Sequence, residues 1–168
     1  PDYSSAASDV YKRQDDPLVI AGQGTVGMEI SEQFPENLYA VFVAVGGGGL
    51  IAGIGAYLNK VHPNVKIIGV EAADSAGLHA SVKAGKRVKL KEVGLFADGA
   101  AAKQIGKNNY ELIKNFLDDS ITVDTDEICA AVKDTFLETR TVHEPTVSLA
   151  LEGLKKYISQ KRIKNKNL

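Results

Sequence analysis

The sequence has few of the residues that mark several large classes of protein. Cys129 is the one cysteine among 168 residues, which excludes an internal disulfide and a multi-cysteine zinc site and favours a reducing compartment. The histidines, His62, His79 and His143, show no pairing at i and i+4, so we expect no metal site. The 20 Lys and Arg balance 21 Asp and Glu, and no apolar run approaches the roughly 20 residues of a membrane-spanning helix. We therefore expect a cytoplasmic globular protein that binds neither nucleic acid nor membrane.

The two ends of the chain differ in composition from the rest. Residues 1–14 are small and polar, and they contain no apolar block of the kind that a secretory signal has. We interpret them as a disordered lead-in, and residues 10–14 also resemble translated sequencing-adapter sequence, which would make the segment an artefact. Residues 161–168 are basic and are predicted to form a solvated tail or, alternatively, a contact patch. Residues 15–160 are then the folded part.

From residue 15 onward, apolar segments typical of buried strands alternate with segments of helical periodicity. The predicted strands are residues 38–45, 66–71 and 120–123; the predicted helices are residues 50–61, 75–84, 107–117, a helix that begins at Asp124 or Thr125, and residues 146–159. Strands joined by helices pair in parallel through right-handed crossovers. The pattern therefore predicts an α/β fold with a doubly wound parallel sheet.

Four consecutive glycines, residues 46–49, follow the first of these strands, and Leu50 opens the next helix. Such a run has a large conformational-entropy cost, so we expect it where side chains cannot be tolerated. Ligands bind at the carboxyl ends of strands in open parallel sheets, and a helix N-terminus attracts anions. No Lys-Ser/Thr pair follows, in contrast to loops that bind nucleoside triphosphates. The segment predicts a site for a phosphate monoester that is not transferred.

A second glycine-rich segment, residues 22–27, matches the dinucleotide-binding pattern G-x-G-x-x-G after the apolar residues 18–20. A dinucleotide site should also have an acidic residue about 20 positions further on, at the end of the next strand. That strand ends at Val45 without one. We therefore interpret these glycines as allowing close packing of a helix on the sheet, and a nucleotide-binding domain stays open as an alternative.

These segments, together with later ones, resemble the fold-type II pyridoxal-phosphate enzymes, whose sheet is like that of the tryptophan synthase β subunit. The similarity is greatest to the biosynthetic threonine dehydratases, and it is carried by residues 15–25, 45–53, 69–71, 93–99, 123–131 and 144–145. It extends from Asp15 to Leu168. The resemblance implies an incomplete version of the family's sheet, with a return strand of the smaller domain near the start of the chain.

The same resemblance implies deamination of L-threonine to 2-oxobutanoate and ammonium, the first step of isoleucine biosynthesis, in a homo-oligomeric parent enzyme. L-serine is an alternative substrate. The implied cofactor is pyridoxal 5'-phosphate, which absorbs the electrons released at the α-carbon. The implied cofactor-binding residues are those of the phosphate loop and one glycine beside the cofactor ring, namely Gly46, Gly47, Gly48, Gly49, Leu50 and Gly99.

Several parts of the family's active site have no counterpart in this stretch. The Schiff-base lysine and the Ser-x-Gly-Asn-His loop would precede residue 15, the serine at the pyridine nitrogen would follow Leu168, and the C-terminal regulatory domain is absent. We therefore expect an interior fragment with no catalytic residue of its own and no dehydratase activity in isolation. The alternatives are another lyase of the same fold, such as serine dehydratase, or a non-catalytic phosphate- or nucleotide-binding module.

Individual residues carry three further expectations. Glu71 has the position of a metal-binding glutamate in related racemases, but Gly77 replaces its acidic partner, so we expect Glu71 to cap a helix or to face solvent. Cys129 is expected to be buried and inert on an apolar helix face. Thr146 and Val147 follow Glu-Pro where the family has small residues, and they add bulk at the start of a helix near the site.

Overall fold

The computed structural model describes residues 14–34, 38–164 and 166–168, so the prediction for the lead-in lies outside the described residues except at Gln14. The elements are α2 (Pro17–Gln33), β1 (Ala40–Ala44), α3 (Gly49–Val61), β2 (Lys66–Ala72), η1 (Ala73–Ser75), α4 (Gly77–Ala84), η2 (Asp98–Ala100), α5 (Lys107–Ile113), β3 (Leu117–Val123), α6 (Thr125–Thr139) and α7 (Pro145–Lys161). None of the described helices is long and apolar enough to cross a membrane.

The strands form one parallel sheet in the order β1-β2-β3 across the described residues. Val43 pairs with Gly69 in the first ladder, and Val70 pairs with Ile121 in the second. Each connection between neighbouring strands contains at least one helix, as parallel pairing requires. The prediction of an α/β fold with a parallel sheet is therefore confirmed.

Some element boundaries differ from the predictions. β3 begins at Leu117, where that residue pairs with Ile67, so α5 ends at Ile113 rather than at residue 117. The helix predicted from residue 75 begins at Gly77, because Ala73–Ser75 form a separate 3-10 turn. The helix α5 is therefore shorter than the periodicity of the local sequence predicts, and Leu117 belongs to the sheet instead.

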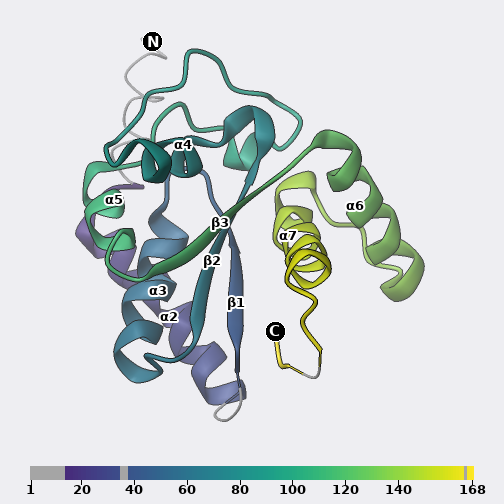
Figure 1. Ribbon diagram of the computed structural model, residues 1–168, viewed down its shortest axis with the longest axis horizontal. Helices are drawn as coiled ribbons and strands as arrows, with labels where there is room; N and C mark the ends of the chain where they lie inside the picture. The colour runs from purple at the N-terminus through teal and green to yellow at the C-terminus, as the bar shows by residue number, and fades with distance from the viewer. Residues whose placement is uncertain (1–13, 35–37, 165) are drawn as a thin grey trace.

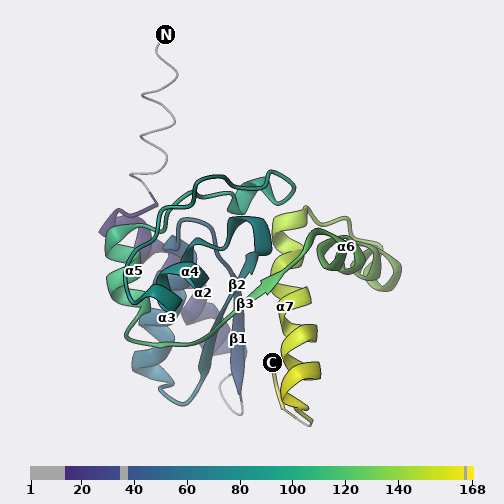
Figure 2. The same ribbon diagram turned by 45° about the horizontal axis from the view of Figure 1, so that its top comes forward.

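Helices cover both faces of the sheet (Figures 1 and 2). α3, α4 and α5 lie on one face, with α2 against α3, while α7 lies on the other face with α6 against it. Ile67 of β2 belongs to the core on the α3 side, together with Leu58, and Ile68 belongs to the core on the α7 side, together with Leu149. Burial on both faces explains why the strands are almost continuously apolar.

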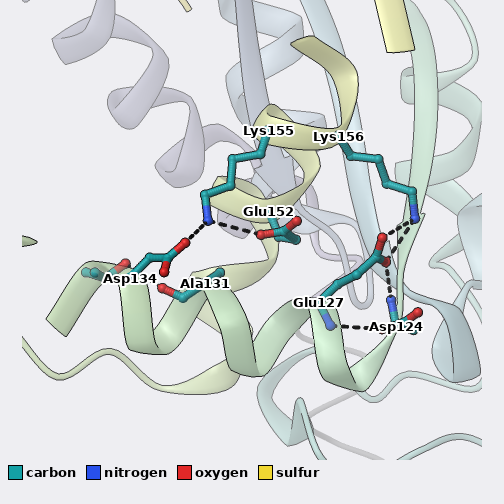
Figure 3. A network of polar contacts seen from close by, with 8 residues as sticks. Asp124, Glu127, Ala131, Asp134, Glu152, Lys155 and Lys156 are labelled. Carbon is teal, nitrogen blue, oxygen red and sulfur yellow. Dashed lines mark hydrogen bonds and ion pairs between the residues drawn. The ribbon is translucent and has the colours of Figure 1, made fainter. Parts of the chain in front are cut away.

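α6 is held to α7 and to the end of β3 by polar contacts (Figure 3). The Glu127 N–H donates to the Asp124 side chain, and the Asp124 N–H donates to the Glu127 carboxylate, both at 2.8 Å. This capping box confirms the predicted start of the helix. Lys156 on α7 donates to Glu127 at 2.8 Å and to the Thr122 carbonyl at 3.0 Å. Figure 3 shows a second group of contacts further along the same two helices.

The end of the chain lies against the sheet. α7 continues to Lys161, and the Tyr39 N–H donates to the Asn167 carbonyl at 2.8 Å. Leu38 and Asn167 form an isolated parallel bridge. Part of the segment predicted as a solvated tail therefore contacts the start of β1, whereas the proposed domain boundary at residue 160 stays a prediction.

The predicted return strand near the start of the chain is wrong, because this segment forms α2. Asp16 is the N-cap, and its carboxylate accepts the Leu18 N–H at 2.8 Å. Pro17 occupies the first helical turn, where a missing N–H costs nothing. The G-x-G-x-x-G segment, residues 22–27, lies inside this helix and forms no strand-to-helix turn. The expected geometry of a dinucleotide loop is therefore absent from these residues.

The glycines of α2 allow a close contact between helices rather than the predicted contact with the sheet. A Cβ atom on Gly27 would lie 3.1 Å from the Ile54 carbonyl oxygen of α3. On the α3 side, a Cβ atom on Gly53 would lie 2.7 Å from the Gln23 carbonyl carbon and would overlap the Ile20 carbonyl oxygen. The two backbones approach closely because neither glycine has a side chain between them.

Gly53→Ala should destabilise the protein by about 1–3 kcal/mol, because the added methyl group would collide with the backbone of α2. Gly22→Ala is the matched control, since a Cβ atom there meets nothing within 4 Å. That substitution should stabilise the protein by about 0.5–1 kcal/mol through lower backbone entropy. Urea unfolding measures both changes, and equal effects of the two substitutions would contradict the close helix contact.

Candidate functional site

The glycine loop, which comprises Gly46, Gly47, Gly48 and Gly49, connects the carboxyl end of β1 to α3. The Val45 N–H donates to the Val70 carbonyl at 2.8 Å, immediately before the loop leaves the sheet. Gly48 is the N-cap of α3 and has a φ angle of 93°, which strains any residue with a Cβ atom. The loop therefore turns the chain from sheet into helix through a conformation that requires glycine.

The space around the glycine loop is filled by backbone and by buried side chains. A Cβ atom on Gly46 would lie 3.0 Å from the Ala100 Cα, and one on Gly48 would lie 2.9 Å from the Ile105 side chain. A Cβ atom on Gly49 would lie 2.9 Å from the Gln14 carbonyl oxygen. Several glycines are needed together because different parts of the structure enclose the loop on different sides.

The loop and the first turn of α3 present a series of backbone donors. The Ala52 N–H donates to the Gly48 carbonyl at 2.9 Å, and this is the first backbone hydrogen bond of the helix. Among the described residues, no acceptor is found for the amide N–H groups of residues 46–51. The N-terminus of α3 also has a positive electrostatic potential. These donors and this potential fit an anion.

A cavity of about 540 Å³ lies beside the loop, and every residue predicted to bind the cofactor lines it. Its lining includes Gly46, Gly47, Gly48, Gly49, Leu50 and Gly99. Apolar side chains of α2, α3 and β1 form much of the wall, and Val41 and Ile54 are examples. The fold thus brings Gly99 to the glycine loop from a position about 50 residues away in the sequence.

The start of α7 forms a polar part of the same cavity. Glu144 and Thr146 line it together with the apolar Val147, and α7 contacts both β1 and η2. A Cβ atom on Gly99 would lie 2.9 Å from the Thr146 hydroxyl oxygen. Glu144 is the one charged residue among the described residues of the lining, and no Lys or Arg is among them. An anion in this cavity would therefore be bound by backbone dipoles rather than by a cationic side chain.

Sequence reasoning missed two residues of this region, Asn109 and Gln14, and it placed Thr146 near the site without a role for its hydroxyl. Asn109 of α5 is fully buried, and its Nδ2 donates to the Gly47 carbonyl at 2.8 Å. Gln14, which was set aside with the lead-in, places its side chain against Gly47 and its buried Oε1 finds no partner among the described residues. The Thr146 hydroxyl is likewise buried without a partner there. No local pattern signals these contacts, because each joins positions far apart in the chain.

Glu71 at the end of β2 caps α4, which is one of the two roles expected for it from the sequence. Its carboxylate accepts the N–H groups of Leu78 and His79, each at 2.7 Å, and only 1% of the residue is exposed. Burial raises the pKa of Glu71 to about 7, although the donated hydrogen bonds act in the opposite direction. The alternative of a solvent-facing Glu71 is wrong. No cluster of three metal-ligating side chains occurs within the part of the chain that the structure describes.

The expectation of a buried Cys129 is wrong, because its side chain is exposed. The buried face of α6 contains Ile128, Ala131 and Thr135. Cys129 is one position beyond Ile128, which rotates it about 100° away from that face. The apolar neighbours in the sequence therefore do not predict its burial.

The sequence and the fold are similar to those of known enzymes. The family model described as pyridoxal-phosphate dependent enzyme matches residues 5–168. A biosynthetic L-threonine dehydratase of Burkholderia multivorans is 53% identical over 154 residues, which cover 92% of this chain and 30% of the relative. A mitochondrial threonine dehydratase of Schizosaccharomyces pombe is 53% identical over 91% of this chain and 26% of the relative. The chain thus spans about 30% or less of the length of these curated relatives.

Solved structures agree with this similarity. The processed form of threonine deaminase isoform 2 from Solanum lycopersicum has a TM-score of 0.89 and 42% identity, over 91% of this chain and 44% of that chain. Serine racemase from Dictyostelium discoideum has a TM-score of 0.80 and 32% identity, over 89% of this chain and 48% of that chain. The described fold is therefore a close structural match to a part of these enzymes.

Glu71→Gln should change how stability depends on pH. A folded pKa of about 7 against an ordinary value of 4.5 means that the stability linked to Glu71 is complete below pH 4.5 and is lost as pH rises through about 7. The loss amounts to at most about 3 kcal/mol, and the variant should lack it. Urea unfolding at pH 4.5 and at pH 8 measures the difference. Glu92→Gln, at an exposed carboxylate, is the control and should retain the wild-type slope; an unchanged slope in Glu71→Gln would contradict the assignment.

Proposed function

Because the chain belongs to the family of pyridoxal-phosphate dependent enzymes, we propose that its glycine loop binds the phosphate group of pyridoxal 5'-phosphate. In this proposal the amide groups of Gly46, Gly47, Gly48, Gly49 and Leu50 donate to the phosphate oxygens, and Gly99 lies beside the cofactor ring. The observation that carries the proposal is the run of backbone N–H groups, residues 46–51, without an acceptor among the described residues at the edge of a cavity.

The lack of a cationic side chain in the described lining supports a phosphate that stays attached to its cofactor. The described lining contains no Lys or Arg, so the negative charge would be balanced by backbone dipoles and by the N-terminal ends of α3 and α7. Such a site has no cationic side chain to stabilise the charge that develops on a phosphoryl group during its transfer. This suits a group that anchors a cofactor better than one that is transferred.

The remaining walls of the cavity would orient the cofactor. Apolar residues of α2, α3 and β1, including Val41 and Ile54, would exclude water from one side of it. When bound, pyridoxal phosphate supplies an electron sink for bonds broken at the α-carbon of an amino acid. In this proposal the chain's own residues bind and orient the cofactor, and none of them is the Schiff-base lysine or another catalytic residue.

For the whole protein we propose the deamination of L-threonine to 2-oxobutanoate and ammonium, the reaction that begins isoleucine biosynthesis. The support is the 53% identity to the dehydratase of Burkholderia multivorans and the structural match to a threonine deaminase. L-serine is the alternative substrate, since a serine racemase and a fungal L-serine ammonia-lyase share the fold. Residues 15–160 are proposed to be the cofactor-binding part, and the isolated chain should release no 2-oxobutanoate.

A cytoplasmic location and a homo-oligomeric state are also proposals. The relatives include enzymes named as mitochondrial in Schizosaccharomyces pombe and as chloroplastic in Solanum lycopersicum, so the compartment differs within the group. The balanced charge of the chain, 20 basic against 21 acidic residues, supports a small-molecule substrate rather than a nucleic-acid partner.

Gly48→Ala should weaken the binding of pyridoxal phosphate at least about 10-fold, because the substitution strains the loop that holds the amide donors. Gly85→Ala is the matched control. Gly85 also has a positive φ angle, 64° against 93° at Gly48, but it ends α4 and lies outside the cavity lining. Equilibrium dialysis with pyridoxal phosphate, competed by inorganic phosphate, measures the affinity. Equal affinities of the two variants would contradict a phosphate site at the loop.

A chimera tests the proposed reaction. When the 154 matching residues of the Burkholderia multivorans enzyme are replaced by those of this chain, L-threonine should still yield 2-oxobutanoate, which is measured as its hydrazone. The same chimera with Gly48→Ala should lose most of this activity. A folded chimera that binds the cofactor but acts on L-serine alone would contradict the threonine assignment and favour the alternative.

A further inference from the structure

The carbonyl group of Gly47 is held by two donors from the α5 side of the loop. The Gly106 N–H donates to it at 3.0 Å, and Asn109 Nδ2 donates to it at 2.8 Å. Asn109 is 62 positions away in the sequence and fully buried. Its Nδ2 also donates to the Gln14 carbonyl at 2.8 Å. The orientation of one peptide group in the glycine loop is thus fixed from outside the loop.

This peptide group needs such a constraint because glycine stands on both sides of it. A peptide between two residues with Cβ atoms is restricted by their φ and ψ preferences, whereas glycine accepts both signs of φ. The Gly47–Gly48 peptide can therefore rotate by half a turn with little steric cost from its own residues. The hydrogen bonds to the Gly47 carbonyl select one of the two orientations.

The selected orientation decides whether an N–H donor or a carbonyl oxygen faces the cavity. In a planar trans peptide the carbonyl and the N–H point in opposite directions. The Gly47 carbonyl points to Asn109 and Gly106, which do not line the cavity, so the Gly48 N–H points away from these two donors. Gly48 itself lines the cavity, and we take its N–H to face it. A rotated peptide would replace this donor by a carbonyl oxygen, whose partial negative charge repels an anion.

We infer that Asn109 is a positioning residue that fixes the Gly47–Gly48 peptide so that the Gly48 N–H can donate to a bound phosphate. The inference rests on the proposed function of the glycine loop and adds to it a residue from a distant helix. Asn109 Oδ1 is buried without a partner among the described residues, which is unfavourable. Packing alone would favour an apolar residue beside Tyr110 and Ile113. The two donated hydrogen bonds explain why an amide stands at this position.

Asn109→Leu tests the inference, because leucine has nearly the same shape but no donor. Inorganic phosphate is the probe, and its affinity should fall about 10- to 100-fold, the effect of losing one hydrogen bond to a charged group. Asn108→Leu is the matched control on the same helix: Asn108 is exposed and donates to the Asp15 carbonyl at 2.9 Å, without contact to Gly47. That variant should bind phosphate like the wild type.

An NMR measurement separates positioning from a general loss of structure. In the wild-type protein, added phosphate should shift the Gly48 amide resonance. In Asn109→Leu, where only the Gly106 N–H still holds the Gly47 carbonyl, this response should become clearly smaller while the Gly49 and Leu50 amides respond as before. The wild-type protein gives a second readout that needs no variant. The hydrogen-bond coupling between Asn109 Nδ2 and the Gly47 carbonyl should persist when phosphate is bound.

The outcomes distinguish the inference from the function on which it rests. Equal phosphate affinity in Asn109→Leu and the wild type, or loss of the Asn109 to Gly47 coupling on phosphate binding, would overturn the positioning role alone. If Asn109→Leu does not fold, the wild-type coupling still decides the question. A wild-type protein whose loop amides do not respond to phosphate would overturn the proposed function itself.

Discussion

The turn between β1 and α3 leaves no space for side chains, and the candidate site depends on this steric constraint. Ala100 lies against Gly46, and Ile105 lies against Gly48. Because these contacts come from distant segments, the loop is narrow on more than one side. The same absence of side chains leaves the backbone N–H groups accessible to a ligand, so the packing and the proposed binding have one physical origin.

The proposed phosphate site would balance charge without a cationic side chain among its described lining residues. Backbone N–H groups and the N-termini of α3 and α7 supply partial positive charges that do not titrate, whereas the described lining has no Lys or Arg. Whether a peptide group presents a partial positive charge to the cavity depends on its orientation, since a rotated peptide presents an acceptor instead of a donor. Residues outside the cavity, such as Asn109, therefore contribute to the site by fixing the backbone.

Two predictions failed for reasons that concern contacts rather than composition. A return strand was expected near the start of the chain, but Asp16 and Pro17 start a helix there, and its glycines find a partner backbone in α3. Cys129 has apolar neighbours in the sequence, but α6 packs through the face that contains Ile128 and Ala131. In both cases the decisive partner is another helix, which local periodicity does not identify.

The sequence by itself determined the alternation of strands and helices, the glycine loop at the carboxyl end of a buried strand, and the cap at Asp124, because each depends on neighbouring residues and backbone preferences. The tertiary structure alone decided that Gln14, Ile105 and Asn109 surround the loop, whereas the family resemblance had already placed Gly99 and Thr146 near it. Asn109 lies 62 positions from Gly47 and reaches it through the packing of α5 against α3. Such contacts follow from how the helices cover the two faces of the sheet, and this arrangement leaves no pattern in any short stretch of residues.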